Sequence, residues 1–281
     1  MKVTKIAVLL TTFNRVSKTL SCLNSLRNQQ LPPGVELEVF LTDDASADGT
    51  ADAVKRDFPA THVFQGTGSL YWAGGMRETW KQARLHTPDY YLLVNDDTLL
   101  NRDAIALLLR SSAAGTPDIC IGSTQDDASE QISYGGWKVS TPKRWKSERV
   151  HSNTEYLDCD FGNANIMLIS KQVVDSIGIL ADHFTHSLAD YDYTLRAKKA
   201  GFTVTVAPGF LGSCIDDHGN NWKSANTTFK ERVQYLKSPK GLAYKEYLRF
   251  IKDHFPLSYP SAFVKLWMKT FFPFIWDRLK K

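Results

Sequence analysis

Two apolar runs in this chain each end in a pair of acids, and this pattern constrains the fold more than any other feature. The run Tyr90–Val94 leads into Asn95-Asp96-Asp97. The run Leu37–Thr42 leads into Asp43-Asp44. Short apolar runs that are bounded by turns and followed by helical patterns are typical of buried strands. Because parallel strands present the same ends to one side of a sheet, both acid pairs are expected to line one cleft.

The acids Asp96 and Asp97 predict a cation. Adjacent carboxylates repel each other, which raises one pKa unless a cation or a donor network neutralises them, and neither Lys nor Arg stands near them in the sequence. Mg²⁺ or Mn²⁺, held between carboxylates and a substrate's phosphates, is the simplest such cation. The alternative is a helix cap, with Asp97 or Thr98 at the start of a helix predicted within Asn101–Ala113.

Composition places the chain among ordinary soluble proteins. Its 281 residues suffice for one large domain with an appendage, and 43% of them are hydrophobic. The net charge of +4 is too small to call for a nucleic-acid partner. Four widely spaced cysteines without a C-x-x-C pair argue against a zinc site or a disulfide framework. The apolar run Ile6–Leu10 is too short for a signal peptide, so we expect a first strand in a cytoplasmic protein.

Strand and helix patterns alternate through the first part of the chain. This alternation predicts a parallel sheet with right-handed crossovers. The expected elements are strand Ile6–Leu10, a helix from Val16, strand Leu37–Thr42, a helix through Ala51, Val54 and Phe58, strand His62–Phe64, a helix with Met76, Trp80 and Ala83 inward, and strand Tyr90–Val94.

The pattern loosens between Ser123 and Asp158. This stretch is rich in Ser, Asp, Gly, Lys and Trp, and we expect strands and loops that cover the cleft and select substrates. Regular structure then returns. The expected elements are strand Asn163–Ser170, helix Val173–Ile177, helix Asp190–Ala200 and strand Thr203–Ala207.

In order and spacing, these motifs resemble the family 2 glycosyltransferases over about residues 4–222. The resemblance implies the GT-A fold, an α/β architecture with a mostly parallel central sheet flanked by helices. Here we expect it over residues 1–226, with a C-terminal helical segment at 227–281. The matching residues are Thr11-Thr12-Phe13-Asn14-Arg15, Asp43 to Thr50 in the manner of D-D-x-S-x-D-G-T, Asn95-Asp96-Asp97 at the D-x-D motif, Asp190-Tyr191-Asp192, Leu195-Arg196, Gly201-Phe202 and His218.

The resemblance implies a nucleotide-binding set at the first two strand ends. A carboxylate there accepts from a base N–H or a ribose hydroxyl, and Asp43 is the first choice; the alternative is a residue that only stabilises a turn. The segment Gly68–Arg77 resembles that of bacterial rhamnosyltransferase-like members, or else serves a tight turn. The expected nucleotide-binding residues are Thr11, Phe13, Asn14, Arg15, Asp43, Asp44, Gly74, Arg77, Asn95 and Asp96.

The D-x-D register implies the metal ligands. Asn95 takes the first position, where the family has an acid, so Asp97 is the principal carboxylate on Mn²⁺ or Mg²⁺. Asn95 is then left to contact ribose or order water, and Asp96 to contact the sugar. His218 falls where relatives supply a further metal or pyrophosphate contact, and an imidazole suits Mn²⁺ better than Mg²⁺.

The resemblance also implies a catalytic base. Asp190 aligns with the aspartate of the family's E-D pair, and Ala189 stands at the glutamate. The base would take a proton from an acceptor hydroxyl and give inversion, an effect of about 10²- to 10⁴-fold on rate. Asp192 competes for this role, although acids in the first turn of a helix are also favoured by its dipole.

The expected activity is inverting sugar transfer from a nucleoside-diphosphate sugar, dTDP- or UDP-linked, to a glycan or lipid-linked glycan in polysaccharide assembly. Rhamnosyl transfer is one such reaction. Two alternatives stay open. One is a nucleotidyltransferase, although Thr11–Arg15 is not a basic, glycine-rich phosphate loop. The other is a non-catalytic nucleotide-sugar-binding subunit, which the departures at Asn95 and Ala189 allow.

The segment after about Thr227 changes character and becomes aromatic and basic. A helix is predicted at Tyr244–Phe255, and Phe263–Trp276 carries too many lysines and a proline for a membrane-spanning helix. Peripheral contact with the inner face of the cytoplasmic membrane is expected, with aromatic rings in lipid and lysines toward anionic head groups. The lysines are Lys265, Lys269, Lys280 and Lys281. The alternative is docking on the body of the protein or on a second subunit in a homodimer.

Overall fold

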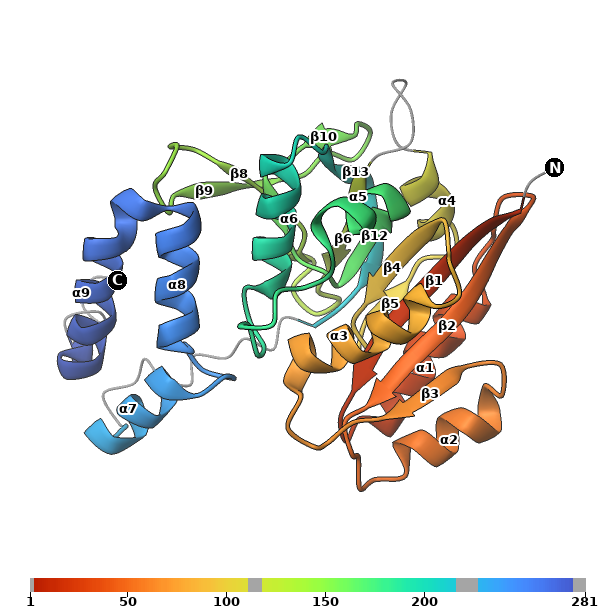
Figure 1. Ribbon diagram of the computed structural model, residues 1–281, viewed down its shortest axis with the longest axis horizontal. Helices are drawn as coiled ribbons and strands as arrows, with labels where there is room; N and C mark the ends of the chain where they lie inside the picture. The colour runs from red at the N-terminus through yellow and green to blue at the C-terminus, as the bar shows by residue number, and fades with distance from the viewer. Residues whose placement is uncertain (1–2, 111–117, 216–226, 275–281) are drawn as a thin grey trace.

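The computed structural model describes residues 3–110, 118–215 and 227–274. Within these ranges, a ten-stranded sheet forms the centre of the molecule and helices cover both of its faces (Figure 1). Its main path runs β10-β13-β6-β12-β4-β1-β2-β3. The predicted α/β class, a central sheet flanked by helices and followed by C-terminal helices, is confirmed.

The first half of the sheet is parallel, as the alternation predicts. β1 pairs in parallel with both β2 and β4, and β2 pairs in parallel with β3. The carboxyl ends of these strands therefore lie at one edge. The elements are β1 (Thr4–Thr12), α1 (Val16–Arg27), β2 (Val35–Asp43), α2 (Thr50–Asp57), β3 (His62–Gln65), α3 (Tyr71–Arg84) and β4 (Tyr90–Val94).

The second half of the sheet is mixed. β12 runs antiparallel to both β4 and β6, whereas β13 is parallel to β6. The helix predicted within Asn101–Ala113 is α4, which is shorter. The elements are β5 (Leu99–Leu100), α4 (Ala104–Leu109), β6 (Ile119–Gln125), β7 (Ile132–Tyr134), β10 (Leu157–Asp158), β12 (Ile166–Ser170), α5 (Lys171–Ile177), α6 (Ala189–Lys199) and β13 (Val204–Ser213).

Side-chain alternation along the strands divides the core into two layers. On β1, Ala7 and Leu9 face the layer that contains α3, α5 and α6. Ile6, Val8 and Leu10 face the layer that contains α1, α2 and α4. A strand that is covered on both faces has to be apolar throughout, which is why these strands appear in the sequence as continuous apolar runs.

The stretch 123–158 forms part of a second, smaller sheet. Its strands β8 (Gly136–Val139) and β9 (Ser147–Val150) pair with β11 (Phe161–Gly162) in the order β11-β8-β9. Trp145, in the β8–β9 hairpin, contacts the rings of Phe250 and Phe255 at centroid distances of 5.3 and 5.0 Å. The insert therefore packs against the C-terminal segment.

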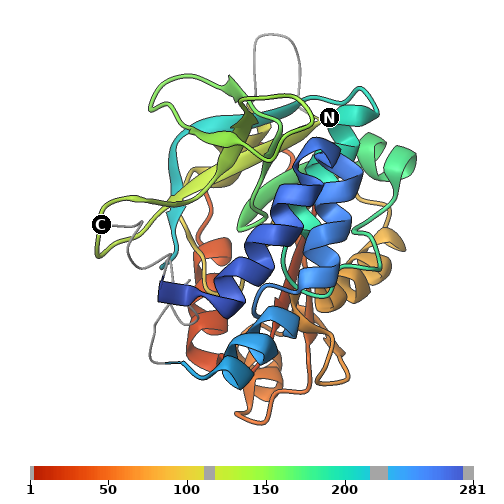
Figure 2. The ribbon, with the colours of Figure 1, turned by 90° about the vertical axis from the view of Figure 1, so that its left-hand side faces the viewer.

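The C-terminal segment lies along one side of the molecule (Figures 1 and 2). It contains α7 (Phe229–Lys237), α8 (Tyr244–His254), η1 (Pro256–Ser258) and α9 (Tyr259–Phe271). Phe250, Ile251 and Leu266 join the same hydrophobic cluster as α3 and α6. The segment thus shares a core with the sheet. None of the helices in the described ranges has both the length and the apolar character needed to cross a bilayer.

Candidate active site

The loops that follow β1 and β2 are joined by Asn14 and Ser46. The N–H of Asn14 donates to Ser46 Oγ at 2.8 Å, and the N–H of Ala47 donates to Asn14 Oδ1 at 2.7 Å. Asn14 has a φ of 52°, a left-handed conformation that asparagine adopts more readily than most residues. The side-chain oxygen of Asn14, expected to face a nucleotide, therefore holds the two loops together.

Asp48 fixes the first turns of two helices. Its Oδ2 accepts from the N–H of Val16, and its Oδ1 accepts from the N–H of Thr50. These residues open α1 and α2. The Thr50 hydroxyl and then the Val16 N–H hold the pKa of Asp48 below its usual value. The last acid of the Asp43–Thr50 motif is thus structural.

Asp44 organises the loop before α3. Its carboxylate accepts the backbone N–H groups of Gly68, Leu70 and Tyr71 at 2.7, 2.8 and 3.2 Å. A Cβ at Gly66 would lie 2.6 Å from Asp44 Oδ1, so only glycine fits there. Asp44 therefore places Tyr71 and the residues that follow it at the edge of the sheet.

Asp43 differs from Asp44 in having an unused acceptor. Its Oδ1 accepts from the N–H of Ser46 at 2.9 Å. Its Oδ2 is buried and has no hydrogen-bond partner among the described residues. A buried carboxylate oxygen without a donor is costly, so a ligand N–H or O–H at this position would be stabilising.

A pocket of about 370 Å³ opens between these loops. The exposed ring of Phe13 lies at its wall, and Ser238 and Lys240 reach it from the connection between α7 and α8. Its volume and its mixed apolar and polar lining suit a small organic ligand. The remaining lining residues are Thr11, Thr12, Arg15, Asp44, Gly68, Tyr71, Trp72, Asp96 and His186.

Asp96 and Asp97 share the guanidinium of Arg15. Arg15 Nη1 lies 2.7 Å from Asp97 Oδ2 and 3.3 Å from Asp96 Oδ1, and Lys18 Nζ lies 3.8 Å from Asp97 Oδ2. Basic side chains do stand beside these acids, because α1 brings them from far away in the sequence. Burial raises the pKa of Asp96 to about 6, against the opposing charge of Arg15.

The donor set at the end of β4 fits a hard divalent cation. Asp96 and Asp97 supply carboxylate oxygens, the ligands that Mg²⁺ and Mn²⁺ accept, and the basic side chains beside them, Arg15 and Lys18, are exposed and able to move away. Asn95 Oδ1 already accepts from Trp72 Nε1 at 2.8 Å, which leaves the two acids as the main ligands. His218, the other predicted ligand, lies outside the described residues.

A second compartment of about 320 Å³ adjoins the first. The β4 end, with Asn95, Asp96 and Asp97, forms one part of its lining, and Asp190 and Tyr191 from α6 form another. Arg15, Trp72, Asp96 and His186 line both compartments. The predicted metal ligand and the predicted base therefore face one hollow, whereas Asp43 lines neither compartment.

Asp190 is held at the start of α6. Its Oδ2 accepts from the N–H of Ala164 at 3.2 Å, and its Oδ1 accepts from the N–H of Tyr191 at 2.9 Å. Leu188, immediately before the helix, has a φ of 68°, so the chain turns sharply there. Ala189 is fully buried, so the position aligned with the family's glutamate is part of the core here.

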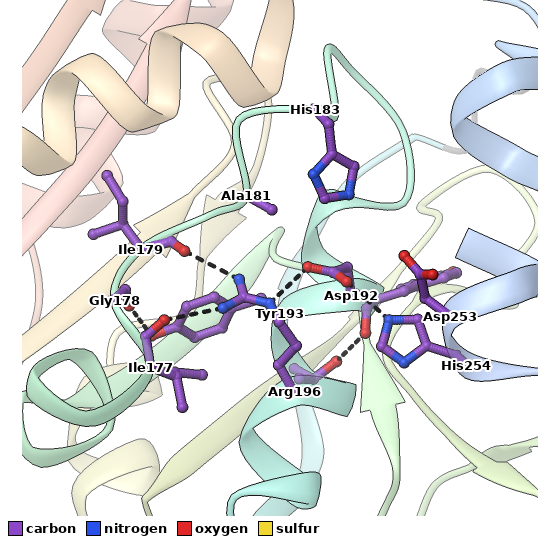
Figure 3. Close-up of polar contacts among 12 residues, drawn as sticks. Ile177, Gly178, Ile179, Ala181, His183, Asp192, Tyr193, Arg196, Asp253 and His254 are labelled. Carbon is purple, nitrogen blue, oxygen red and sulfur yellow. Dashed lines mark hydrogen bonds and ion pairs between the residues drawn. The ribbon is translucent and has the colours of Figure 1, made fainter. Parts of the chain in front are cut away.

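Asp192 lines neither compartment and points toward Arg196 and His254 (Figure 3). Its Oδ2 accepts from Arg196 Nε at 2.8 Å, and its Oδ1 lies 2.8 Å from Nε2 of His254 in α8. Burial raises the pKa of Asp192, but the hydrogen bond from His254 and the charge of Arg196 outweigh it and hold the pKa below its usual value. Its surroundings are those of a packing residue, contrary to its place among the candidate bases.

Gly74 and Arg77 line neither compartment, contrary to expectation. Arg77 Nη1 donates to the carbonyls of Ala181 and Phe184 at 2.9 and 2.8 Å, which anchors the loop before α6. Gly74 is buried within α3. At the next residue, Gly75, a Cβ would lie 2.0 Å from Thr11 Oγ1. Gly75 thus lets α3 approach β1 closely.

Several lining residues were not predicted. Tyr134 comes from the insert, His186 from the loop before α6, and Lys240 from the C-terminal segment. Trp72 lies in the segment Gly68–Arg77, but no contact was assigned to it, and its indole donates to Asn95. Tyr134, His186 and Lys240 belong to no short motif, so only the packing of distant segments places them here.

The comparisons with known proteins agree with this geometry. The sequence profile of the family described as Glycosyl transferase family 2 matches residues 7–176, more than half of the chain. No curated protein matches the sequence. The matched region contains both acid pairs but ends before Asp190.

Solved structures share the fold. The chain is similar to the mannosyltransferase PcManGT from Pyrobaculum calidifontis in complex with GDP-Man and Mn²⁺, with a TM-score of 0.57 and 15% identity over 95% of this chain and 70% of that one. It is also similar to S. aureus TarS 1-349 in complex with UDP, with a TM-score of 0.54 and 17% identity over 83% and 66%. A complex of TarS with UDP-GlcNAc gives the same TM-score at 18% identity. The chain thus spans about two thirds of the length of TarS 1-349. On this fold and this profile, the chain belongs to glycosyl transferase family 2 and is a glycosyltransferase.

Proposed function

We propose that this glycosyltransferase moves a sugar from a nucleoside-diphosphate sugar to a hydroxyl of a glycan or lipid-linked glycan, with inversion at the anomeric carbon. One observation carries the proposal. Asp190 and the Asp96–Asp97 pair line a single compartment that opens into the pocket beside β1 and β2. A base on one side and a cation-binding acid pair on the other are what one displacement of a diphosphate requires.

The nucleotide occupies the larger pocket in this proposal. Phe13 offers a ring against which a base can stack, and the unpartnered Oδ2 of Asp43 supports acceptance of a base N–H or a ribose O–H. Arg15 and Lys240 line the same pocket and are the nearest candidates for contacts to the diphosphate. The solved relatives are complexes with GDP-Man, UDP and UDP-GlcNAc. These complexes support a nucleotide-sugar donor without choosing among bases.

Asp97 is the proposed principal metal ligand, with Asp96 beside it. A bound Mn²⁺ or Mg²⁺ supplies positive charge against the charge that develops on the departing diphosphate. Because Arg15 Nη1 contacts both acids, metal binding requires the guanidinium to move away from them. Arg15 lines both compartments, so it stays near enough to contact the diphosphate.

Asp190 is the proposed base. The Ala164 N–H orients one carboxylate oxygen, and Asn163 and Tyr191 line the compartment beside it. Asp190 accepts the proton of the acceptor hydroxyl as that oxygen forms its bond to the anomeric carbon. The bond from that carbon to the diphosphate breaks at the same time, so the product has the opposite configuration.

The donor can be identified by thermal shift. dTDP-, UDP- and GDP-linked sugars, dTDP-rhamnose among them, are added with and without Mn²⁺ to the parent and to Asp97→Asn. A ligand that binds only the folded protein at 100 times its Kd stabilises it by about 2.7 kcal/mol. We expect a metal-dependent shift for one donor in the parent and a much smaller one in Asp97→Asn. No shift with any nucleoside diphosphate would overturn the proposal.

We also propose that α9 rests on an anionic membrane surface, where a lipid-linked acceptor would be found. Phe263, Val264 and Phe271 of α9 are exposed, as is Leu257 just before it. The N–H of Leu257 donates to the carbonyl of Lys143 in the β8–β9 hairpin. Lys143, Arg144 and Lys146 have exposed side chains in the hairpin that contacts Leu257, and basic side chains close to exposed apolar ones favour anionic lipid.

Vesicle binding tests this placement. The double variant Phe263→Ser/Val264→Ser should lose sedimentation with phosphatidylglycerol vesicles, and the matched control Leu85→Ser should keep it, because Leu85 is 76% exposed at the end of α3. Neutral phosphatidylcholine vesicles should bind the parent more weakly. Equal binding by both variants would contradict the proposal.

A further inference from the structure

A group of metal-ligating side chains lies well away from the cleft. Glu38 belongs to β2, His62 opens β3, and His86 follows the end of α3. Glu38 Oε1 lies 2.8 Å from His62 Nε2 and 2.9 Å from His86 Nδ1. The three ligand atoms all lie within 4.8 Å of one another. Glu38 stands five residues before Asp43 on β2, roughly 17 Å along the strand at about 3.3 Å per residue.

Aromatic packing fixes the two imidazoles. The buried ring of Phe40 stacks on His62, with centroids 4.7 Å apart and an interplanar angle of 15°. His86 meets Phe40 edge-on at 4.9 Å and His62 at 5.0 Å. Both rings therefore turn a nitrogen toward the same carboxylate oxygen. Such orientation lowers the entropy that binding an ion would otherwise cost.

The cluster has the composition of an open three-ligand site. Zinc takes imidazole nitrogen and carboxylate oxygen at about 2.0–2.2 Å in a tetrahedron, which places ligand atoms about 3.3 Å apart. The contacts of 2.8 and 2.9 Å need only small adjustments, and the His62, His86 and Glu38 side chains are 39–40% exposed, so an ion can enter. The alternative is an ion-free cluster in which Glu38 Oε1 contacts both imidazoles directly. A test has to distinguish this cluster from a metal site.

We propose that Glu38, His62 and His86 bind one divalent transition metal ion, Zn²⁺ in preference to Mg²⁺, with water in the remaining position. Two imidazoles select zinc and its neighbours over the hard cations that oxygen ligands prefer. The ion cross-links β2, β3 and the chain beyond α3. This site is separate from any metal at Asp97. It was not predicted from the sequence, because Glu38, His62 and His86 lie in different segments of the chain and form no short motif.

Calorimetric titration of the tag-free chain with Zn²⁺ tests the site, with Asp97→Asn as the background that removes the proposed catalytic ligand. One equivalent should bind in that background. Adding His86→Gln or Glu38→Gln should weaken binding by about 10- to 100-fold or more. The matched control is His151→Gln, since His151 pairs with Asn153 outside the cluster. It should bind like the background.

Two further readouts keep the test decisive. Co²⁺ in the same background should show the intense visible absorption of a tetrahedral site, and His86→Gln should lose it. Zn²⁺ should raise the melting temperature of the Asp97→Asn background, EDTA should reverse the rise, and adding His86→Gln should abolish it. Equal affinity in the background and in His86→Gln, or loss of the bound equivalent in Asp97→Asn alone, would overturn the proposal. Neither result depends on transferase activity.

Discussion

Two clusters in this protein join carboxylates to an arginine, and their surroundings differ. In the cleft cluster, Asp96 and Asp97 share one guanidinium nitrogen of Arg15, whose side chain is 41% exposed. In the α6 cluster, Asp192 is held by Arg196 and His254. Arg196 also donates to the carbonyls of Ile177 and Ile179 (Figure 3).

The two clusters differ in whether a metal ion could replace the basic side chain beside the carboxylates. The α6 cluster has one acid for two basic side chains, the side chains of Asp192 and His254 are buried, and the pKa of Asp192 is lowered. The cleft cluster has two acids beside two exposed basic side chains, Arg15 and Lys18, and burial raises the pKa of Asp96 to about 6. Because these exposed side chains can move away, the two acids can accept a metal ion. A site whose charges are already matched contributes to stability instead.

The largest expected effect separates Asp190 from Asp192, which lie on one helix. Asp190→Asn should lower the rate of nucleoside diphosphate release with acceptor present by about 10²- to 10⁴-fold, because a base of this kind contributes that factor. Its melting temperature should stay close to that of the parent. Asp192→Asn is the matched control and should keep its rate per folded molecule. The reverse pattern would show that the two acids have been assigned the wrong way round.

Asp192→Asn should instead lower stability. Removing one partner of a buried ion pair leaves the others uncompensated, and we expect a loss of about 3 kcal/mol in urea unfolding. The pKa of Asp192 is lower in the folded protein than in the unfolded chain. The carboxylate therefore adds to the free energy of unfolding above about pH 4, and this stabilisation is lost as the pH falls through the pKa of the folded protein. Parent and variant should therefore converge in acid. A difference that stays constant down to pH 2 would contradict the ion-pair account.

Asp96→Asn should raise the free energy of unfolding of the ligand-free protein, whereas Asp192→Asn should lower it. The pKa of Asp96 is about 6 in the folded protein and 3.8 in the unfolded chain, so ionisation of Asp96 lowers the free energy of unfolding. This loss is absent below about pH 4 and complete above about pH 6. Each pKa unit is worth about 1.4 kcal/mol, and the rise of about two units already includes the attraction of Arg15, so the variant should be about 3 kcal/mol more stable at pH 8. Urea unfolding across this range measures it. Destabilisation at pH 8 would contradict the assigned pKa.

Arg15→Gln should have the smallest effect. An exposed ion pair contributes at most about 1 kcal/mol, so the melting temperature should change little. Without donor, Mn²⁺ should bind the variant a few-fold more tightly, since no guanidinium competes for the acids. With a nucleotide sugar present the advantage should vanish or reverse. Electron paramagnetic resonance of free Mn²⁺ measures both, and weaker Mn²⁺ binding without donor would show that Arg15 does not compete.

The sequence predicted the strands and helices correctly where its hydrophobic residues followed a single strand or helix pattern. The runs Ile6–Leu10 and Tyr90–Val94 appear as central strands, and Met76, Trp80 and Ala83 face the core as predicted. The mixed direction of the second half could not be foreseen. β12 has the same apolar pattern whether it runs parallel or antiparallel, and only its pairing with β4 and β6 decides.

The site was predictable at strand ends and less so elsewhere. Asp97 and Asp190 face one hollow as the motifs implied. Arg77 was misplaced because an arginine after a glycine segment can bind a phosphate or a loop carbonyl, and the loop at Ala181 lies far away in the sequence. Asp192 could not be separated from Asp190, because its partner His254 lies in a helix outside every motif.

The position of Lys240 and Ser238 at the rim of the larger pocket has a consequence for the whole chain. These residues connect α7 to α8, so the tail that follows residue 226 supplies part of the wall around the ligand. A fragment that ends at residue 226 would lack this part of the pocket wall. The exposed apolar side chains of α9 follow in the same stretch of chain, so a change that displaces this tail would also disturb the pocket wall.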